Sequence, residues 1–260
     1  MDDKTKKKIE AMRKAGTMLG EVLDQVLRFV GPGVTEIELD RLAERLILEK
    51  GGECGFKKVD GYAHTVCVST NDVVVHGIPK DRVLVEGDII GIDCGVYLDG
   101  FHTDMAETIV VGKNNDEKVK NFLAVGKKAM YNGILQAKAG HRVGHISRAM
   151  QDTMEGASYS VVRSLVGHGV GKELHEEPEV PGYLEKEIRR TPVLSEGMTI
   201  AVEAIYNMGR AGVKYDGSDD WTIISEDGSL AGLFERTILV TADGPELITH
   251  FPGETLPSLE

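Results

Sequence analysis

The segment Glu86-Gly87-Asp88-Ile89-Ile90-Gly91-Ile92-Asp93 has a counterpart later in the chain, Glu196-Gly197-Met198-Thr199-Ile200-Ala201-Val202-Glu203. Each begins with an acidic residue and a glycine, which favour a turn, and continues as an apolar run that indicates a buried strand. Each run ends on a carboxylate. A second carboxylate opens a later strand in each half, Asp104 in the first and Glu235 in the second. The pattern predicts an internal duplication that pairs Asp93 with Glu203 and Asp104 with Glu235.

The other segments repeat the same order of elements. Apolar residues recur at three- and four-residue steps over the first thirty positions, which predicts a helix that ends at Gly31-Pro32-Gly33. Thr35 and Glu38 form a capping box that opens a second helix. Further helices are predicted at about 116–138 and 144–155, and strands within 65–111 and near 161–166, 198–206, 221–225 and 235–240. We therefore expect one α+β domain over residues 1–260, with related halves at about 1–112 and 113–250 and no separate N-terminal extension domain.

The composition argues against several classes of protein. The net charge of −12 over 260 residues argues against general binding to nucleic acid or a membrane surface, which needs a basic field. The cluster from Lys4 to Lys8 is predicted to be a solvated helix face. The three cysteines form no C-x-x-C pair and indicate free thiols in a reducing compartment. Because the chain also shows no signal region and no long apolar run, we expect a cytoplasmic protein.

The acidic residues carry the chemistry. Asp93 ends a run that reads as a buried strand, where a core ion pair is the simplest explanation of a carboxylate. Asp104 lies beyond a hairpin predicted to turn at Leu98-Asp99-Gly100, and antiparallel pairing can bring the two carboxylates together. Two like charges so close repel strongly unless a cation lies between them. Together with Glu203, Glu235 and His168, these acids predict a site for two divalent cations.

Two other motifs are excluded around the histidines. His168 lies in a glycine-rich stretch, Gly167-His168-Gly169-Val170-Gly171-Lys172, but a phosphate-binding loop needs glycine where Val166 stands and serine or threonine where Glu173 stands. The stretch His175-Glu176-Glu177-Pro178 does not match the H-E-x-x-H motif of zinc proteases. His76 ends an apolar strand, where a histidine is more often structural than functional.

Several motifs resemble type I methionine aminopeptidases, in the same order and without a large insertion. They are 71–79, Asp93 with Asp104, 168–171 with 175–178, Glu203, and 219–222 leading to Glu235. The resemblance runs from the first helix to about residue 250. It implies the "pita-bread" α+β fold, in which two pseudo-symmetric halves place helices on a curved antiparallel sheet. It also implies removal of the N-terminal methionine from nascent polypeptides.

The resemblance assigns roles to particular residues. The metal ligands would be Asp93, Asp104, His168, Glu203 and Glu235, which suit two divalent ions of Co, Mn, Fe or Zn. The catalytic residues would be His76, His175 and Glu203. Substrate would contact Tyr62, Cys67, His76, Leu174, His175, Ile205 and Trp221. We expect a monomer that acts on peptide or nascent-chain N-termini and has no DNA or membrane partner. Any contact with the ribosome would be transient, through the globular surface or the Lys4–Lys8 cluster.

The chain departs from the family pattern at four positions. Arg236 stands where histidine is usual, Ala204 where proline is usual, Thr103 where glycine is common and Leu174 where an aromatic residue is typical. Strand alternation predicts that Arg236 points away from the metal carboxylates. Two rival functions remain open at this stage. One is a proline-directed aminopeptidase or dipeptidase of the same fold, and the other is a catalytically inactive module of this fold that binds a protein or nucleic-acid partner.

Overall fold

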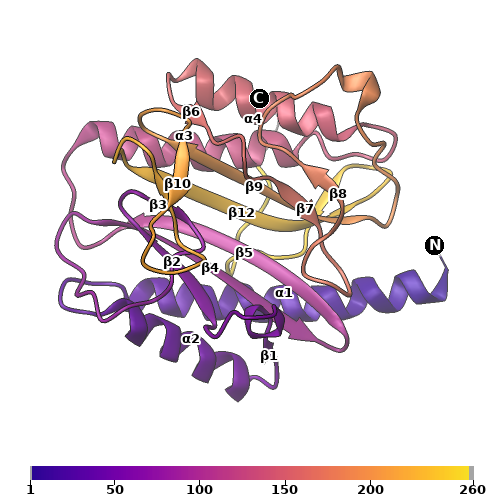
Figure 1. Cartoon of the computed structure of the whole chain (residues 1–260). Helices are drawn as coiled ribbons and strands as arrows, with labels where there is room; N and C mark the ends of the chain where they lie inside the picture. The colour runs from indigo at the N-terminus through magenta and orange to yellow at the C-terminus, as the bar shows by residue number, and fades with distance from the viewer. Residues whose placement is uncertain (1, 258–260) are drawn as a thin grey trace.

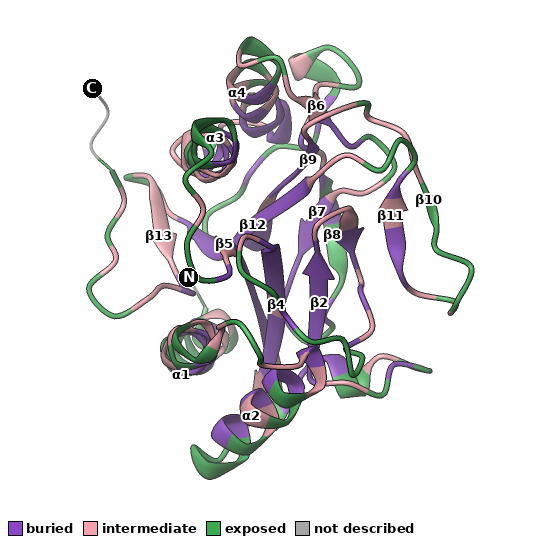
Figure 2. Cartoon of the chain, turned by 90° about the vertical axis from the view of Figure 1, so that its left-hand side faces the viewer, coloured by how far each residue is buried: buried purple, intermediate pink, exposed green. Residues whose placement is uncertain are grey.

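Two antiparallel sheets and four α-helices make up the fold in a computed structural model that describes residues 2–257. The larger sheet runs through the middle of the molecule, with α1 and α2 at one end and α3 and α4 at the other (Figure 1). Seen from the side, α1 and α3 lie on one face of this sheet and the small β10–β11 ribbon lies beyond the other (Figure 2). The predicted α+β class is therefore confirmed.

The helices begin where the sequence supplies caps. Asp2 accepts a hydrogen bond from the Thr5 amide at 2.7 Å at the start of α1, and the capping box of Thr35 and Glu38 opens α2 as predicted. Asp116 caps α3 by accepting from the Lys118 amide. The helices are α1 Asp3–Phe29, α2 Glu36–Glu49, α3 Glu117–Ile134 and α4 Val143–Gly156, with short 3-10 turns η1 Phe56–Lys58 and η2 Ile188–Arg190. None of these helices has both the length and the apolar character needed to cross a membrane.

The larger sheet has the order β1-β4-β5-β12-β9-β7-β8, with β2 beside β4, β6 beside β9 and β13 beside β12. The smaller sheet has the order β10-β11-β3. The strands are β1 Glu53–Cys54, β2 Val66–Thr70, β3 Val73–Val75, β4 Ile89–Leu98, β5 Phe101–Val110, β6 Ser160–Val161, β7 Gly167–Gly169, β8 Glu176–Val180, β9 Thr199–Asn207, β10 Val213–Tyr215, β11 Ile223–Ser225, β12 Ala231–Val240 and β13 Pro245–Leu247. The predicted β4–β5 hairpin is present, with Leu98 opposite Phe101.

Two predicted strands differ from the structure. The strand predicted near 161–166 is largely absent: β6 ends at Val161, the exposed residues Arg163 and Ser164 form a bend, and β7 begins only at Gly167. The strand predicted near 235–240 begins earlier, at Ala231, and its apolar start pairs with β9. These shifts follow from an apolar run that indicates a strand without fixing its ends.

Each helix pair covers its own part of the sheet. Side chains of α1 and α2 pack on β2, β4 and β5, around Leu19, Leu39 and Ile92. Side chains of α3 and α4 pack on β9 and β12, around Phe122, Met150 and Ile238. We propose that these two units correspond to the related halves predicted at about 1–112 and 113–250, within one domain.

Replacing Gly20 by alanine is expected to destabilise the fold. A Cβ at this position of α1 would lie 1.8 Å from the carbonyl oxygen of His250, so the helix would have to move away from the C-terminal segment. Overpacking of this kind costs about 1–3 kcal/mol, which exceeds the gain of about 1 kcal/mol in helix propensity. Chemical denaturation measures the free energy of unfolding. Gly156→Ala, with no atom within 4 Å of the added Cβ, is the matched control and is expected to leave stability unchanged or slightly higher.

Candidate metal centre

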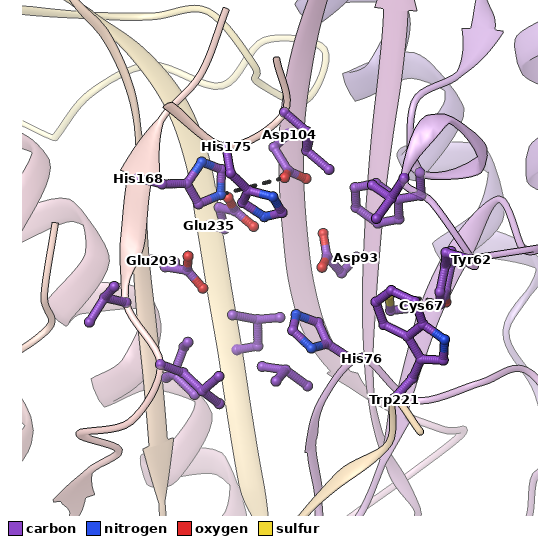
Figure 3. A pocket seen from close by; sticks show the side chains of 18 residues that line it. Tyr62, Cys67, His76, Asp93, Asp104, His168, His175, Glu203, Trp221 and Glu235 are labelled. Carbon is purple, nitrogen blue, oxygen red and sulfur yellow. Dashed lines mark hydrogen bonds and ion pairs between the residues drawn. The ribbon is translucent and has the colours of Figure 1, made fainter. Parts of the chain in front are cut away.

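The strand register places three acidic residues in one row across the sheet. Asp93 on β4 lies opposite Ala106 on β5, Ala106 lies opposite Glu235 on β12, and Glu235 lies opposite Glu203 on β9. Residues opposite one another in a sheet project to the same face. Their carboxylates therefore enter the same cavity, on the face that the helices leave open (Figure 3).

Asp104 joins this cavity from a neighbouring position. It lies opposite Gly95, two residues before Ala106, so it is not the positional equivalent of Glu235 in the sheet. The pairing of Asp104 with Glu235 that the repeat predicted is therefore wrong by two residues, whereas Asp93 and Glu203 do occupy matching places in the row. Two residues along a strand restore the same face, which is why Asp104 still points at the other acids.

His168 approaches the acids from β7. Its Nε2 lies 3.9 Å from Oδ2 of Asp104, while its Nδ1 lies 2.9 Å from the carbonyl oxygen of Gly169. A proton on Nδ1 satisfies that carbonyl and leaves the Nε2 lone pair directed at the cavity. Burial and the neighbouring His175 lower the pKa of His168 to about 4, so the imidazole is neutral at pH 7. Neutral imidazole is the form that binds a metal ion.

The acidic side chains are strongly destabilised as anions without a cation. Burial, and then repulsion from neighbouring acids, raises the pKa of Asp93 and the pKa of Glu235. Burial raises the pKa of Asp104 to about 7. Burial and repulsion from Asp104 raise the pKa of Glu203 to about 8. Oδ1 of Asp93 and Oε1 of Glu235 are buried and accept no hydrogen bond from the described residues. Buried acceptors left this way are unfavourable unless a donor or a cation reaches them.

The donor set therefore fits divalent cations. Ligand atoms of Asp104, His168 and Glu235 lie within 4.8 Å of one another, close enough for one ion to contact all three. Asp93 and Glu203 line the same cavity outside that trio. Carboxylate oxygens with a single imidazole nitrogen suit first-row divalent metals such as Mn, Fe, Co or Zn.

Two further histidines face the acids. His76 follows β3 and His175 precedes β8, and the close-up shows both imidazoles directed into the cavity (Figure 3). The backbone of His76 has a φ of 55°, a conformation that non-glycine residues adopt at a cost and that recurs at functional sites. Burial lowers the pKa of His76 to about 4 and lowers that of His175. Both are therefore neutral and can donate one hydrogen bond each.

The apolar part of the cavity has two separate walls. Four of the predicted pocket residues, Tyr62, Cys67, Leu174 and Trp221, pack together with Phe56. The rings of Tyr62 and Trp221 meet edge-on at 5.1 Å, and the Tyr62 hydroxyl donates to the carbonyl oxygen of Val66 at 2.8 Å.

Ile205, the fifth residue predicted only as a pocket contact, lies instead in the second wall, with Leu165 and Leu233. The cavity between these walls holds about 170 Å³. Val75 on β3 also lines the cavity, next to His76, and was not predicted to do so. Five more lining residues were not predicted: Phe56, Val59, Leu165, Val166 and Leu233. Leu233 was within reach, because it stands two residues before Glu235 on one strand and so shares its face. The others come from segments without periodicity, which gives no signal for them.

The departures from the family pattern leave the acids untouched. Arg236 projects from the opposite face of β12, as alternation predicted, and is fully buried there. Thr103 lies opposite Val96, with its hydroxyl 3.4 Å from the Val96 carbonyl oxygen, and Ala204 lies opposite Phe234 in the core. None of the three competes with a cation for the carboxylates.

Relatives of this chain agree with the geometry. The profile of metallopeptidase family M24 matches residues 10–242. A methionine aminopeptidase of Clostridium acetobutylicum is 43% identical over 242 residues, which are 93% of this chain and 95% of that protein. The crystal structure of methionine aminopeptidase from Thermotoga maritima matches with a TM-score of 0.90 and 37% identity, over 94% of this chain and 96% of that one. An Xaa-Pro dipeptidase from Bacillus anthracis matches with a TM-score of 0.75 and 25% identity, over 96% of this chain but only 62% of that one.

These matches confirm the expected pita-bread architecture, since both solved structures share it over nearly the whole chain. With the family profile spanning residues 10–242 and a curated relative 43% identical over almost its full length, this chain belongs to metallopeptidase family M24.

Proposed function

We propose that this protein is a metal-dependent aminopeptidase that removes the N-terminal methionine from polypeptides. The observation that carries the proposal is the row of Asp93, Glu235 and Glu203, joined by Asp104 and His168 around one cavity. Relatives named methionine aminopeptidase cover almost the whole chain, and membership of a metallopeptidase family implies a divalent metal. The intact ligand set also argues against an inactive binding module, which would be free to lose these residues.

The residues around the cavity have different roles in the proposed hydrolysis. The residues that would hold a pair of divalent cations are Asp93, Asp104, His168, Glu203 and Glu235. Such a pair would lower the pKa of a water molecule and polarise a carbonyl oxygen. The Glu203 carboxylate lies in the same cavity and would accept the proton of the attacking water. His175 donates a hydrogen bond to the oxyanion that develops on the scissile carbonyl, and His76 contacts the scissile amide and assists the leaving group.

The aromatic wall suits the methionine side chain. Tyr62, Trp221 and Phe56 present ring edges and faces beside Cys67 and Leu174. A thioether is flexible and polarisable, and it makes favourable contacts with aromatic rings. The wall begins on β2, where Cys67 lies directly opposite Asp93. A side chain held there keeps the following peptide bond beside the acidic row.

The metal pair, the assembly and the location complete the proposal. We infer two ions per chain of Co, Mn, Fe or Zn, and a monomer that meets nascent chains in the cytoplasm. The three cysteines are free and buried, which suits a reducing compartment. Any transient ribosome contact would use exposed basic residues of α1 such as Lys4 and Lys7. Lys8 is less available, because its Nζ donates a hydrogen bond to the carbonyl oxygen of Gly197 at 3.2 Å.

Removal and return of metal tests the reaction itself. Protein stripped with a chelator is expected to release no methionine from Met-Ala or Met-Gly peptides, and addition of Mn²⁺ or Co²⁺ is expected to restore release. Quantifying free methionine by chromatography measures this directly. Peptides that begin with Xaa-Pro are the control substrates and are expected to stay intact. Cleavage of those in preference to Met-Ala would replace this proposal with the dipeptidase alternative.

Substitution of single ligands tests the assignment of the acids and the histidine. Glu203→Gln keeps the shape of the side chain but removes its charge and basicity, so turnover is expected to fall by about 100- to 10,000-fold. His168→Ala is expected to lose activity to a similar extent because it removes a metal ligand. Circular dichroism is expected to show the wild-type fold in both variants. Near-normal turnover in either one contradicts the assignment.

Trp221→Ala tests the aromatic wall. Loss of the indole removes apolar contact with the methionine side chain, so kcat/KM for Met-Ala peptides is expected to fall by about tenfold. Tyr215→Ala is the matched control, because this ring lies nearby in sequence but is 64% exposed and outside the cavity. Equal kinetics of the two variants would show that the wall does not hold the substrate.

A further inference from the structure

Arg236 follows Glu235 in the chain and is fully buried on the face of the sheet that carries the helices. Its Nη2 lies 2.7 Å from Oε2 of Glu107, and its Nε donates to Oε1 of Glu254 at 3.0 Å. The guanidinium carbon also lies 4.8 Å from the centre of the Phe251 ring. A buried cation with two carboxylate partners is electrostatically compensated, and the planar guanidinium holds several partners in fixed directions.

The same guanidinium also binds the backbone of the acidic row. Nη1 donates to the carbonyl oxygen of Glu235 at 2.8 Å and to that of Ala106 at 3.1 Å. These two residues are opposite one another on β12 and β5, between Asp93 and Glu203 in the row. One rigid group therefore holds both strands at the level of the candidate ligands, directly behind them.

The contact lies where the backbone ladder is shortest among the central strands. The β5–β12 ladder has two opposed pairs, Glu235 with Ala106 and Arg236 with Met105. On either side of these two pairs, threonine hydroxyls connect β5 to β12 by hydrogen bonds. Thr108 Oγ1 binds the backbone of Leu233 at 2.6 and 3.0 Å, and Thr237 Oγ1 binds that of Asp104 at 2.9 Å. We call this boundary between β5 and β12 the seam. The distance between the two strands across the seam therefore depends on side chains.

The seam divides the candidate ligands into two groups. Asp93 and Asp104 stand on β4 and β5, whereas Glu235 and Glu203 stand on β12 and β9. Within each group a continuous ladder fixes the spacing, from Ile89 to Leu98 on one side and from Thr199 to Asn207 on the other. A metal pair that uses both groups requires the distance across the seam to be held within a narrow range.

We propose that Arg236 is a positioning residue for the metal centre, which sets the separation of the two ligand groups by clamping Ala106 and Glu235 from behind the sheet. This inference rests on the proposed metal-dependent function. Arg236 touches neither metal nor substrate, and it acts through the backbone of its two strand partners. Its ion pair with Glu107 anchors the clamp to β5, and its contact with Glu254 anchors the clamp to the C-terminal segment.

Titration of the metal-free protein with Mn²⁺ in a calorimeter tests the clamp. Arg236→Met replaces the aliphatic part of the side chain but loses the guanidinium with every donor. Its Mn²⁺ affinity is expected to be about 10- to 100-fold weaker than that of the wild type. Its kcat is expected to fall while KM for Met-Ala peptides stays within about twofold, since the aromatic wall lies on other segments. Arg236→Lys keeps the charge but cannot reach all partners, so an intermediate affinity is expected.

Ile238→Ala is the control for a purely structural role. This residue shares the strand and the buried face of Arg236 but contacts neither carbonyl of the row, so it lowers the thermal midpoint without loosening the clamp. Wild-type Mn²⁺ affinity in Arg236→Met overturns the inference, as does an equal loss of affinity in Ile238→Ala at a matched midpoint. If Arg236→Met does not fold, the Mn²⁺ affinity of Arg236→Lys is compared with those of the wild type and Ile238→Ala instead. A wild type that binds Mn²⁺ but releases no methionine refutes the proposed function alone.

Discussion

Mutual repulsion among four buried carboxylates is the constraint on which the rest of the structure depends. Two unit charges 4 Å apart interact by about 4 kcal/mol at the effective dielectric of a protein, and several such pairs meet here. A loose scaffold would relieve this repulsion by moving apart, and the site would lose its affinity for cations. The long β4–β5 and β9–β12 ladders prevent that movement within each pair of strands, because Asp93 and Glu203 stand in the middle of them rather than at their ends.

The two faces of the sheet therefore have different roles. One face is covered by helices, whose side chains fill the core and leave no room for substrate. The other face carries the acids and His168, and it is walled by irregular segments that supply His76, His175 and the aromatic rings. Alternation along β12 shows this division within three residues. Glu235 enters the cavity, while Phe234 and Arg236 on either side of it are buried in the opposite layer.

Periodicity and strand alternation in the sequence predict the elements and the face on which each residue projects. The acidic row followed from two apolar runs that end on carboxylates, although both strands continue beyond Asp93 and Glu203 in the structure. The capping box of α2 followed from Thr35 and Glu38. The offset of Asp104 was missed because the two halves were aligned by residue type, whereas the hairpin turn between β4 and β5 places Ala106, not Asp104, opposite Asp93. The division of the lining residues into two walls was not predicted either. Alternation fixes the face on which a residue projects but not which neighbours it meets there, and those neighbours come from loops without a pattern.

The geometry also changes what Leu174 implies for specificity. At this position the family usually has an aromatic ring, so a leucine suggests a thinner wall for the methionine side chain. In the structure Leu174 packs directly against Phe56, Tyr62 and Cys67, and the rings of Phe56 and Tyr62 meet edge-on at 6.3 Å. Trp221 extends the same aromatic surface from another segment. Three rings, two from the connection between β1 and β2 and one from the segment before β11, therefore border the proposed methionine pocket. Leu174 fills the space beside them rather than forming the main contact.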